Sequence, residues 1–242
     1  MFGLTTGFDI SIGNPPFVRQ EILRRNTVFL SGREVSLKDA LKGRFQCYSG
    51  TSDLYVYFYE RSIQLLKDGG VHCYISSNSY LNSTFGESLR SLLQRESSIR
   101  LLIDFAETGV FKAITEPCII VTTKSPVADN LMRVLKWDQN EALENLPSTF
   151  AVKAITLQQI EFRREGWQLE SALVLRLLDK VRKAGRPLGE HVSGRFYYGI
   201  KTGLNEAFIV NAADRARLVA DHASSTELLK PFGFMQKQDR QL

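Results

Sequence analysis

Short apolar runs separated by polar stretches predict four β-strands in the first half of the chain. They cover residues 8–13, 71–75, 99–105 and 118–123. Each run has the length typical of a strand and lies next to a turn-forming or polar segment. We expect the first of them, residues 8–13, to be a short buried strand.

Helical periodicity fills two of the intervals between these strands. The apolar positions that follow Asp53 recur on one helical face until Asp68-Gly69-Gly70, so Asp53 is predicted to cap a helix. A second helix is predicted through Leu89, Leu92 and Leu93. This alternation of strand and helix favours a mostly parallel sheet covered by helices, an α/β fold.

The remaining segments carry weaker signals. Residues 19–50 read as a polar, arginine-rich loop, residues 76–83 as a serine- and asparagine-rich loop, and residues 124–167 as a boundary region. After it, the apolar spacing from Leu169 to Val181 predicts an amphipathic helix. The stretch 194–210 reads as short strands and turns in which basic and aromatic residues alternate.

Composition adds little to this picture, but the position of the charges does. The chain has 242 residues and a net charge of +5, which suits a polyanionic partner without requiring one. Residues 19–44 contain seven basic and three acidic residues, and therefore four of the five excess charges. We expect Arg19, Arg24 and Arg25 to contact DNA phosphates, although a solvated surface loop would show the same composition.

Cysteine and histidine do not indicate a metal or redox site. The three cysteines and three histidines are scattered and lack the spacing of metal ligands. With no apparent secretory leader or long apolar segment, this sparse thiol content predicts a location in the reducing cytoplasm.

The tetrad Asn14-Pro15-Pro16-Phe17 directly follows the first predicted strand and suits chemistry on an exocyclic amino group. The N6 lone pair of adenine is delocalised into the ring, which makes it a poor nucleophile. The side-chain oxygen of Asn14 and the carbonyl of Pro15 can each accept one N6 hydrogen and localise that lone pair on nitrogen. Pro16 stiffens the exit from the strand, and Phe17 offers a ring on which an extrahelical base can stack.

The tetrad and the segments around it resemble adenine-specific DNA methyltransferases of the TaqI-like class, including the fused type IIG restriction-modification enzymes. Residues 8–21 resemble the catalytic motif of this family, residues 52–58 the helix that follows it, and residues 65–71 the turn into the next strand. Residues 109–120 resemble a later hairpin, and residues 199–208 resemble the opening of a target-recognition domain.

The resemblance implies a function and a set of roles. The chain would transfer a methyl group from S-adenosyl-L-methionine to a flipped adenine in double-stranded DNA. In that reaction Asn14 and Pro15 polarise N6, Phe17 and Phe111 sandwich the base, and Lys201 and Asn205 contact DNA. It also implies a partial Rossmann-like methyltransferase sheet with flanking helices, followed by the start of a mixed α+β target-recognition domain.

The same resemblance divides the chain into three parts. Residues 1–125 correspond to the carboxyl-terminal half of the catalytic domain, residues 126–166 to a connecting region, and residues 167–242 to a partial recognition domain. Family members place the glycine-rich cofactor loop before the tetrad, yet only thirteen residues precede Asn14. We therefore expect the main cofactor-binding part to be supplied by a missing amino-terminal half or another subunit.

Two other functions fit parts of the sequence. A protein glutamine methyltransferase would use a similar tetrad on a planar amide, but the downstream basic segment argues against it. A non-catalytic DNA-binding or assembly module would retain the tetrad without turnover, which the missing cofactor loop favours. The DNA target sequence cannot be read from this chain, because base contacts in a recognition domain determine it.

Overall fold

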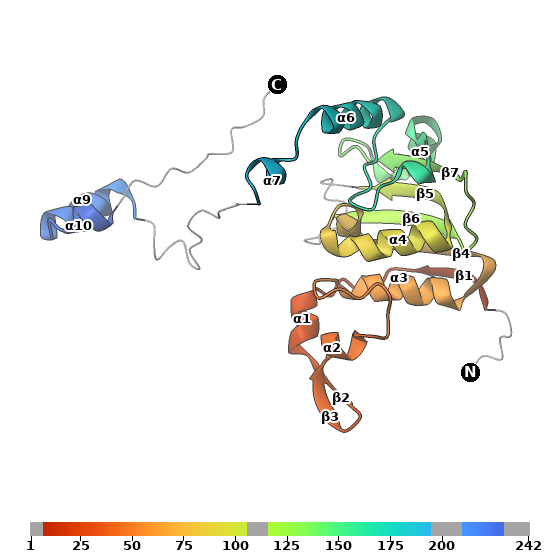
Figure 1. The fold of residues 1–242 in the computed structure, drawn as a ribbon, viewed down its shortest axis with the longest axis horizontal. Coiled ribbons are helices and arrows are strands. Elements are labelled where there is room, and N and C mark those ends of the chain that lie inside the picture. Colours follow the sequence, from red (N-terminus) through yellow and green to blue (C-terminus); the bar gives the residue numbers. More distant parts are fainter. Residues whose placement is uncertain (1–6, 106–115, 195–209, 230–242) are drawn as a thin grey trace. The chain divides into compact units, whose positions relative to one another are not determined.

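The computed structural model describes residues 7–105, 116–194 and 210–229. Its internal contacts divide the chain into two units, Met1–Val181 and Arg182–Leu242. The first unit contains a six-stranded sheet with helices packed on it (Figure 1). The α/β class expected from the sequence is therefore confirmed.

The six strands have the spatial order β1-β4-β6-β5-β7-β8. Pairs β1/β4 and β5/β7 are parallel, whereas β4/β6, β5/β6 and β7/β8 are antiparallel. Strands β1, β4, β5 and β7 therefore run in one direction, and the sheet is mixed rather than mostly parallel. The strand bounds are β1 Phe8–Gly13, β4 Leu66–Ser77, β5 Ser98–Asp104, β6 Pro117–Thr123, β7 Leu131–Lys136 and β8 Ile155–Gln158.

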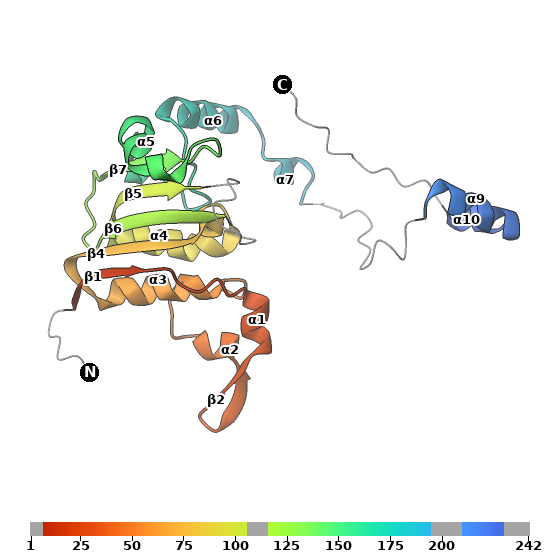
Figure 2. The same ribbon diagram turned by 180° about the vertical axis from the view of Figure 1, so that it is seen from behind.

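Helices α3 (Leu54–Leu65) and α4 (Glu87–Glu96) cover one face of the sheet, which Figures 1 and 2 show from its two sides. Both helices bury the apolar stripes that the sequence predicts. The main core contains residues of these helices and of the strands beneath them: Tyr55, Val56, Tyr59, Ile63, Leu89, Leu92, Leu93, Tyr74, Ile99, Leu102 and Ile120. Burial of this apolar surface is the main force that holds the two layers together.

The opposite face is covered at one end only. There α5 (Leu146–Lys153) packs on a second cluster that contains Ile103, Phe105, Leu135 and Trp137. At the other end β1 is an edge strand, and Ile12 is 78% exposed. The expectation of a strand over residues 8–13 was right, but the expectation that it is buried was wrong, because no strand or helix of the described residues covers this side of β1.

Residues 19–50 form ordered elements rather than the polar loop that we expected. The segment contains α1 (Gln20–Arg25), a β2–β3 hairpin (Thr27–Leu30 and Arg33–Ser36) and α2 (Leu37–Leu41). We call this part of the chain, residues 19–50, the insert. It projects from the sheet at the end of β1 (Figure 1).

Residues 126–166 contribute to the sheet rather than only connecting two domains. They carry β7, α5 and β8, and β7 pairs with β5 in register. The boundary between the two units lies at Val181, beyond residue 167, where we expected the recognition domain to begin. Single turns of 3-10 helix join several elements: η1 Asn78–Leu81, η2 Thr84–Gly86, η3 Leu143–Asn145 and η4 Gln159–Glu161.

Helix α6 (Ala172–Ala184) spans the boundary between the two units. The predicted apolar stripe is present, but Leu173, Leu177 and Val181 are exposed. The described part of the second unit contains α7 (Leu188–His191), α9 (Ala212–Asp221) and α10 (Ser225–Leu228). No helix among the described residues is both long and apolar enough to cross a membrane.

Candidate functional site

The tetrad leaves the sheet at the carboxyl end of β1. Gly13, the last residue of that strand, pairs with Tyr74 of β4. A Cβ atom built on Gly13 would lie 3.4 Å from Cε1 of Tyr74, so Gly13 packs next to the tyrosine ring. The start of the tetrad is therefore positioned by the core strand β4.

The end of the tetrad is tied to the first turn of α3. The Leu54 amide donates a hydrogen bond to the Val18 carbonyl (3.0 Å), and the Gln20 amide donates to Oδ1 of Asp53 (2.9 Å). Each contact satisfies an amide at a helix amino terminus, one in α3 and one in α1. Because Tyr55 and Tyr59 anchor α3 in the core, the tetrad is held between two fixed elements.

Asp53 acts differently from the sequence prediction. It occupies the N-cap position of α3, but its side chain makes no capping bond to that helix. Its carboxylate instead accepts from the first amide of α1. Burial raises the pKa of this carboxyl, and the hydrogen bond from Gln20 opposes that rise.

The tetrad presents two hydrogen-bond acceptors that the described part of the chain does not use. Asn14 is exposed, and its side-chain amide has no hydrogen-bond partner among the described residues. The Pro16 carbonyl accepts from the Val18 amide at 3.0 Å, whereas the Pro15 carbonyl accepts no hydrogen bond from a described residue. Phe17 is 40% exposed and leaves part of its ring open to solvent. The Asn14 amide and the Phe17 ring are therefore open to a ligand, whereas Pro15 is buried and its carbonyl only lacks a partner among the described residues.

Lys38 is a buried cation within the insert, a position that the sequence did not reveal. Its Nζ atom donates to the Ser52 carbonyl and to the Tyr57 hydroxyl, the latter at 2.8 Å. Burial lowers the pKa of Lys38 to about 8, although nearby Asp53 opposes this shift. These bonds attach α2 to the segment that begins α3, so Lys38 supports the insert and does not contribute to its surface charge.

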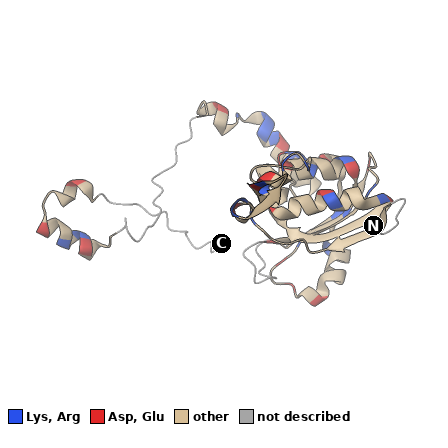
Figure 3. Ribbon diagram, turned by 90° about the horizontal axis from the view of Figure 1, so that it is seen from below, with Lys and Arg blue, Asp and Glu red and all other residues tan. Residues whose placement is uncertain are grey.

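The other six basic residues of segment 19–44 are exposed, as are its three acidic residues. Arg19 is the N-cap of α1, and Arg24 and Arg25 lie in the last turn of this helix. The Arg24 guanidinium donates to the Gly50 carbonyl at 2.8 Å, which also ties the insert together. Figure 3 shows basic and acidic positions mixed along the other elements, so the local excess in the insert is the feature that suits an anionic partner.

Asn78 connects other elements at the same edge of the sheet. It follows β4, and its Nδ2 atom donates to Oδ1 of Asp104 (2.9 Å) and to Oε2 of Glu116 (3.2 Å). Since β1, β4 and β5 run in one direction, their carboxyl ends lie at the same end of the sheet as the tetrad. Asn78 therefore joins the two described ends of the segment between β5 and β6.

Three predicted site residues cannot be placed. Phe111, Lys201 and Asn205 lie outside the described residues. The structure brings the tetrad, Arg19, Arg24 and Arg25 together in one continuous segment. Their roles stay predictions.

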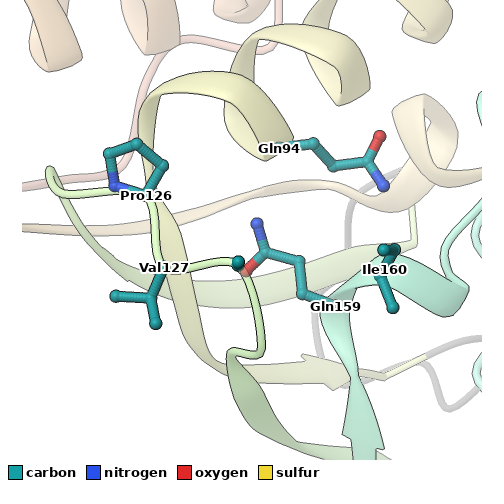
Figure 4. A pocket seen from close by; sticks show the side chains of 6 residues that line it. Gln94, Pro126, Val127, Gln159 and Ile160 are labelled. Carbon is teal, nitrogen blue, oxygen red and sulfur yellow. The ribbon is translucent and has the colours of Figure 1, made fainter.

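A hollow of about 490 Å³ lies at the opposite edge of the sheet, between the end of α4 and the segments that follow β6 and β8 (Figure 4). Its polar side chains form hydrogen bonds with the backbone of neighbouring elements. Oε1 of Gln159 accepts from the Ile99 amide, its Nε2 atom donates to the Ser97 carbonyl, and Gln94 donates to the Phe162 carbonyl. The hollow offers little polar recognition for a ligand.

The basic residues on α1 lead to a prediction for DNA binding. Replacing Arg19, Arg24 and Arg25 by Ala should lower affinity for duplex DNA and reduce the slope of log affinity against log salt by up to about 0.9 per lost phosphate contact. The measurement is a fluorescence anisotropy titration over a series of salt concentrations. Arg100→Ala is the matched control, because Arg100 is exposed on β5. A triple variant with the slope of the parent would show that α1 is only a solvated surface.

Comparison with known proteins supports the sequence resemblance. Residues 1–111 match the Eco57I restriction-modification methylase family. The type II methyltransferase M.PaeR7I of Pseudomonas aeruginosa is 24% identical over 212 residues, which cover 84% of this chain and 35% of that protein. The type II restriction enzyme and methyltransferase RM.Eco57I of Escherichia coli is 28% identical over 211 residues, covering 84% of this chain and 19% of the relative.

Among solved structures, the type IIG restriction endonuclease BpuSI has a TM-score of 0.48 at 17% identity, covering 88% of this chain and 27% of that one. This likeness is too low to add to the sequence matches. The chain spans about a fifth to a third of the length of the curated relatives described above. The resemblance expected from the tetrad and its surroundings is nevertheless confirmed: this chain is similar to restriction-modification methyltransferases, and residues 1–111 match the Eco57I methylase family.

Proposed function

We propose that this chain supplies the adenine-binding part of a site-specific DNA methyltransferase, which transfers a methyl group from S-adenosyl-L-methionine to adenine N6 in double-stranded DNA. The observation that carries the proposal is the pair of unused acceptors in the tetrad, held between β4 and α3. The similarity to type II methyltransferases supports the same class of reaction.

The tetrad would act on the amino group of an extrahelical adenine. Oδ1 of Asn14 and the carbonyl of Pro15 would each accept one N6 hydrogen, and the partly exposed Phe17 ring would stack on the base. Acceptors held in place before the reaction stabilise the developing charge on the attacking nitrogen without a cost of reorganisation. Asp53 and the Val18 carbonyl would position this segment and would not touch the base.

The described residues do not form a cradle for the cofactor. Such a cradle needs a glycine-rich turn between a strand and a helix, so that a ligand can approach the backbone closely. The glycines with tight surroundings meet this chain's own backbone instead: a Cβ on Gly7 would lie 2.7 Å from the Lys67 nitrogen, and one on Gly70 would lie 2.9 Å from the Lys67 oxygen. We therefore assign none of the described residues to the cofactor.

This lack of a cradle in the described part of the chain also favours a second candidate, a DNA-binding or assembly module without turnover. Both candidates use the basic insert and the Phe17 ring. They differ in whether the Asn14 and Pro15 acceptors ever meet an adenine beside a bound methyl donor, so a methylation assay separates them.

The uncovered sheet face indicates how an active enzyme would be assembled. Register places Ile12 beside Cys73, Cys73 beside Val121 and Val121 beside Leu101, which belongs to the α5-covered face. Ile12 therefore lies on the uncovered part of that face, at the unpaired edge β1. An exposed apolar edge of this kind is a template for pairing with further strands, which we propose come from an amino-terminal half or another subunit.

Co-expression tests this proposal. We expect the 242-residue chain alone to leave DNA unmethylated, and we expect methylation when it is produced together with the amino-terminal part of a relative such as M.PaeR7I, up to the segment that matches this chain. Long-read sequencing of the host DNA would map N6-methyladenine. Ile12→Lys should prevent complementation, because it places a charge in the apolar contact, whereas the exposed and distant Val152→Lys should not.

Other outcomes would contradict the proposal in different ways. Methylation by the chain alone would show that it binds the cofactor by itself. Stable association of the two parts without adenine methylation, together with DNA binding, would favour the non-catalytic module.

A further inference from the structure

The β2–β3 hairpin of the insert is built around a tight turn at its tip. Ser31 and Gly32 connect the strands, and both have positive φ, 50° and 77° respectively. Two consecutive left-handed residues are typical of a turn whose twist matches that of the paired strands. The hairpin projects away from the sheet (Figure 1).

The two faces of this hairpin differ in an unexpected way. Val28 pairs with Val35, and both are half-buried where the hairpin contacts α2. Phe29 pairs with Glu34 on the opposite face, and its side chain is 79% exposed. Side chains alternate between the faces of a strand, so the outward position of Phe29 is one where a polar residue is the norm.

Across the insert that carries the hairpin, exposed basic residues outnumber exposed acidic residues by six to three. Arg25 and Arg33 are exposed and form no ion pair or hydrogen bond with the described residues. The nearby carboxylates accept hydrogen bonds within the insert but keep their charge: Glu34, beside Phe29, accepts from the Thr27 hydroxyl, and Asp39 accepts from the Ser36 hydroxyl. The insert thus combines an exposed aromatic ring with two unpaired cations, Arg25 on α1 and Arg33 on the hairpin face opposite Phe29. Aromatic rings and cations together bind unstacked nucleic acid through stacking and phosphate contacts.

We propose that the β2–β3 hairpin is a DNA-contacting finger in which Phe29 stacks on bases exposed when a nucleotide leaves the duplex, while Arg25 and Arg33 contact the flanking phosphates. The proposal rests on the proposed function, since it assigns the finger to the same DNA that the tetrad meets. The insert begins directly after the tetrad, and Asp53 and the Val18 carbonyl fix its base. An apolar side chain inserted between base steps stabilises a distorted duplex.

Binding of the full chain to two DNA probes tests this role. One probe is a duplex of arbitrary sequence, and the other is the same duplex with a central stretch of unpaired bases. The chain should bind the second probe more tightly. Phe29→Ala should weaken binding to the unpaired probe by about fivefold or more, which corresponds to the loss of one stacked base, and should leave the salt slope unchanged.

Two control variants test whether binding to the unpaired probe depends on an aromatic ring at position 29. Phe29→Trp should retain the preference for the unpaired probe, because it keeps an aromatic face. Val152→Ala removes an equally exposed apolar group, 83% exposed on α5, and should bind both probes like the parent. Since Phe29 makes few contacts, its replacement should not unfold the protein, and thermal melting would verify this.

Two results would overturn the proposal. One is equal binding of the parent and Phe29→Ala to the unpaired probe. The other is a change of oligomeric state in Phe29→Ala, measured by sedimentation, which would show that the hairpin contacts a second copy of the chain. Neither result depends on methylation. The proposal for the hairpin can therefore be contradicted while adenine methylation by the complemented enzyme is observed, and the hairpin can bind DNA as proposed while methylation is absent.

Discussion

Replacement of Asn14 by Ala should reduce the turnover of the complemented enzyme by about a hundredfold or more. The change removes one of the two acceptors that polarise N6, and the loss of a single preorganised hydrogen-bonding group in other active sites costs about that much. The effect should fall on kcat, with little change in DNA affinity, because the contact strengthens as charge develops on the nitrogen. Single-turnover methylation of a mapped site would measure it.

The chain offers a matched control for this variant. Asn26 is also exposed, and its side chain makes no hydrogen bond with the described residues, so Asn26→Ala should methylate at the parental rate. Asn14→Asp retains an acceptor oxygen and should lose less activity than Asn14→Ala. Activity of Asn14→Ala within threefold of the parent would rule out the assigned role.

The sequence predicted the strand, the tetrad and the two covering helices because local signals determine them. The run from Phe8 to Gly13 has the length of a strand, and two prolines must end a hydrogen-bonded ladder. The apolar positions of α3 and α4 repeat at helical spacing and are buried. The Asn14 side chain and the Pro15 carbonyl have no partner among the described residues, and their role toward adenine is a proposal.

Other features depend on partners distant in sequence, and no local pattern shows them. Lys38 looks like a surface cation, but its Nζ atom reaches the Ser52 carbonyl and Tyr57, so it is buried. Asp53 looks like the cap of the helix that follows it, but its carboxylate binds the Gln20 amide 33 positions earlier. Only the folded arrangement distinguishes such residues from solvated ones.

The sequence also did not predict correctly that β1 is exposed or that β6 runs antiparallel to its neighbours. An apolar run predicts a buried strand only when both neighbours are present, and among the described strands β1 pairs with β4 alone. Strand and helix alternation likewise predicted parallel pairing, but β6 follows β5 without an intervening described helix and returns antiparallel between β5 and β4. The weak signals in residues 126–166 arise because β8 has only four residues and because Arg133 and Lys136 interrupt the apolar pattern of β7.

His72 gives a second large effect, on stability at low pH. This residue of β4 is fully buried, and neither ring nitrogen has a hydrogen-bond partner in the part of the chain that the structure describes. Its ring lies 4.2 Å from the Tyr74 ring and 5.0 Å from the Tyr59 ring, measured between centroids, and it pairs in register with Thr122. Burial lowers the pKa of His72 to about 3 from its ordinary value of 6.5, so the folded state keeps the imidazole neutral.

The sign of the pH dependence follows from these two pKa values. Above pH 6.5 the imidazole is neutral in both states, and its contribution is fully present; as pH falls from 6.5 toward 3, the unfolded chain binds a proton that the folded chain does not. The free energy of unfolding should therefore decrease by up to about 1.4 kcal/mol per pH unit in this window.

Urea unfolding of the parent and of His72→Phe at pH 7, 6 and 5 would test this expectation. The variant should be at least as stable at pH 7, because it removes two buried nitrogens without partners, and its stability should fall less steeply with acid. His191→Phe, at an exposed position on α7, should keep the parental pH dependence. If the free energy of unfolding decreased equally with falling pH in His72→Phe and in the parent, protonation of other groups would cause the loss. The buried imidazole of His72 would then not be what destabilises the fold in acid.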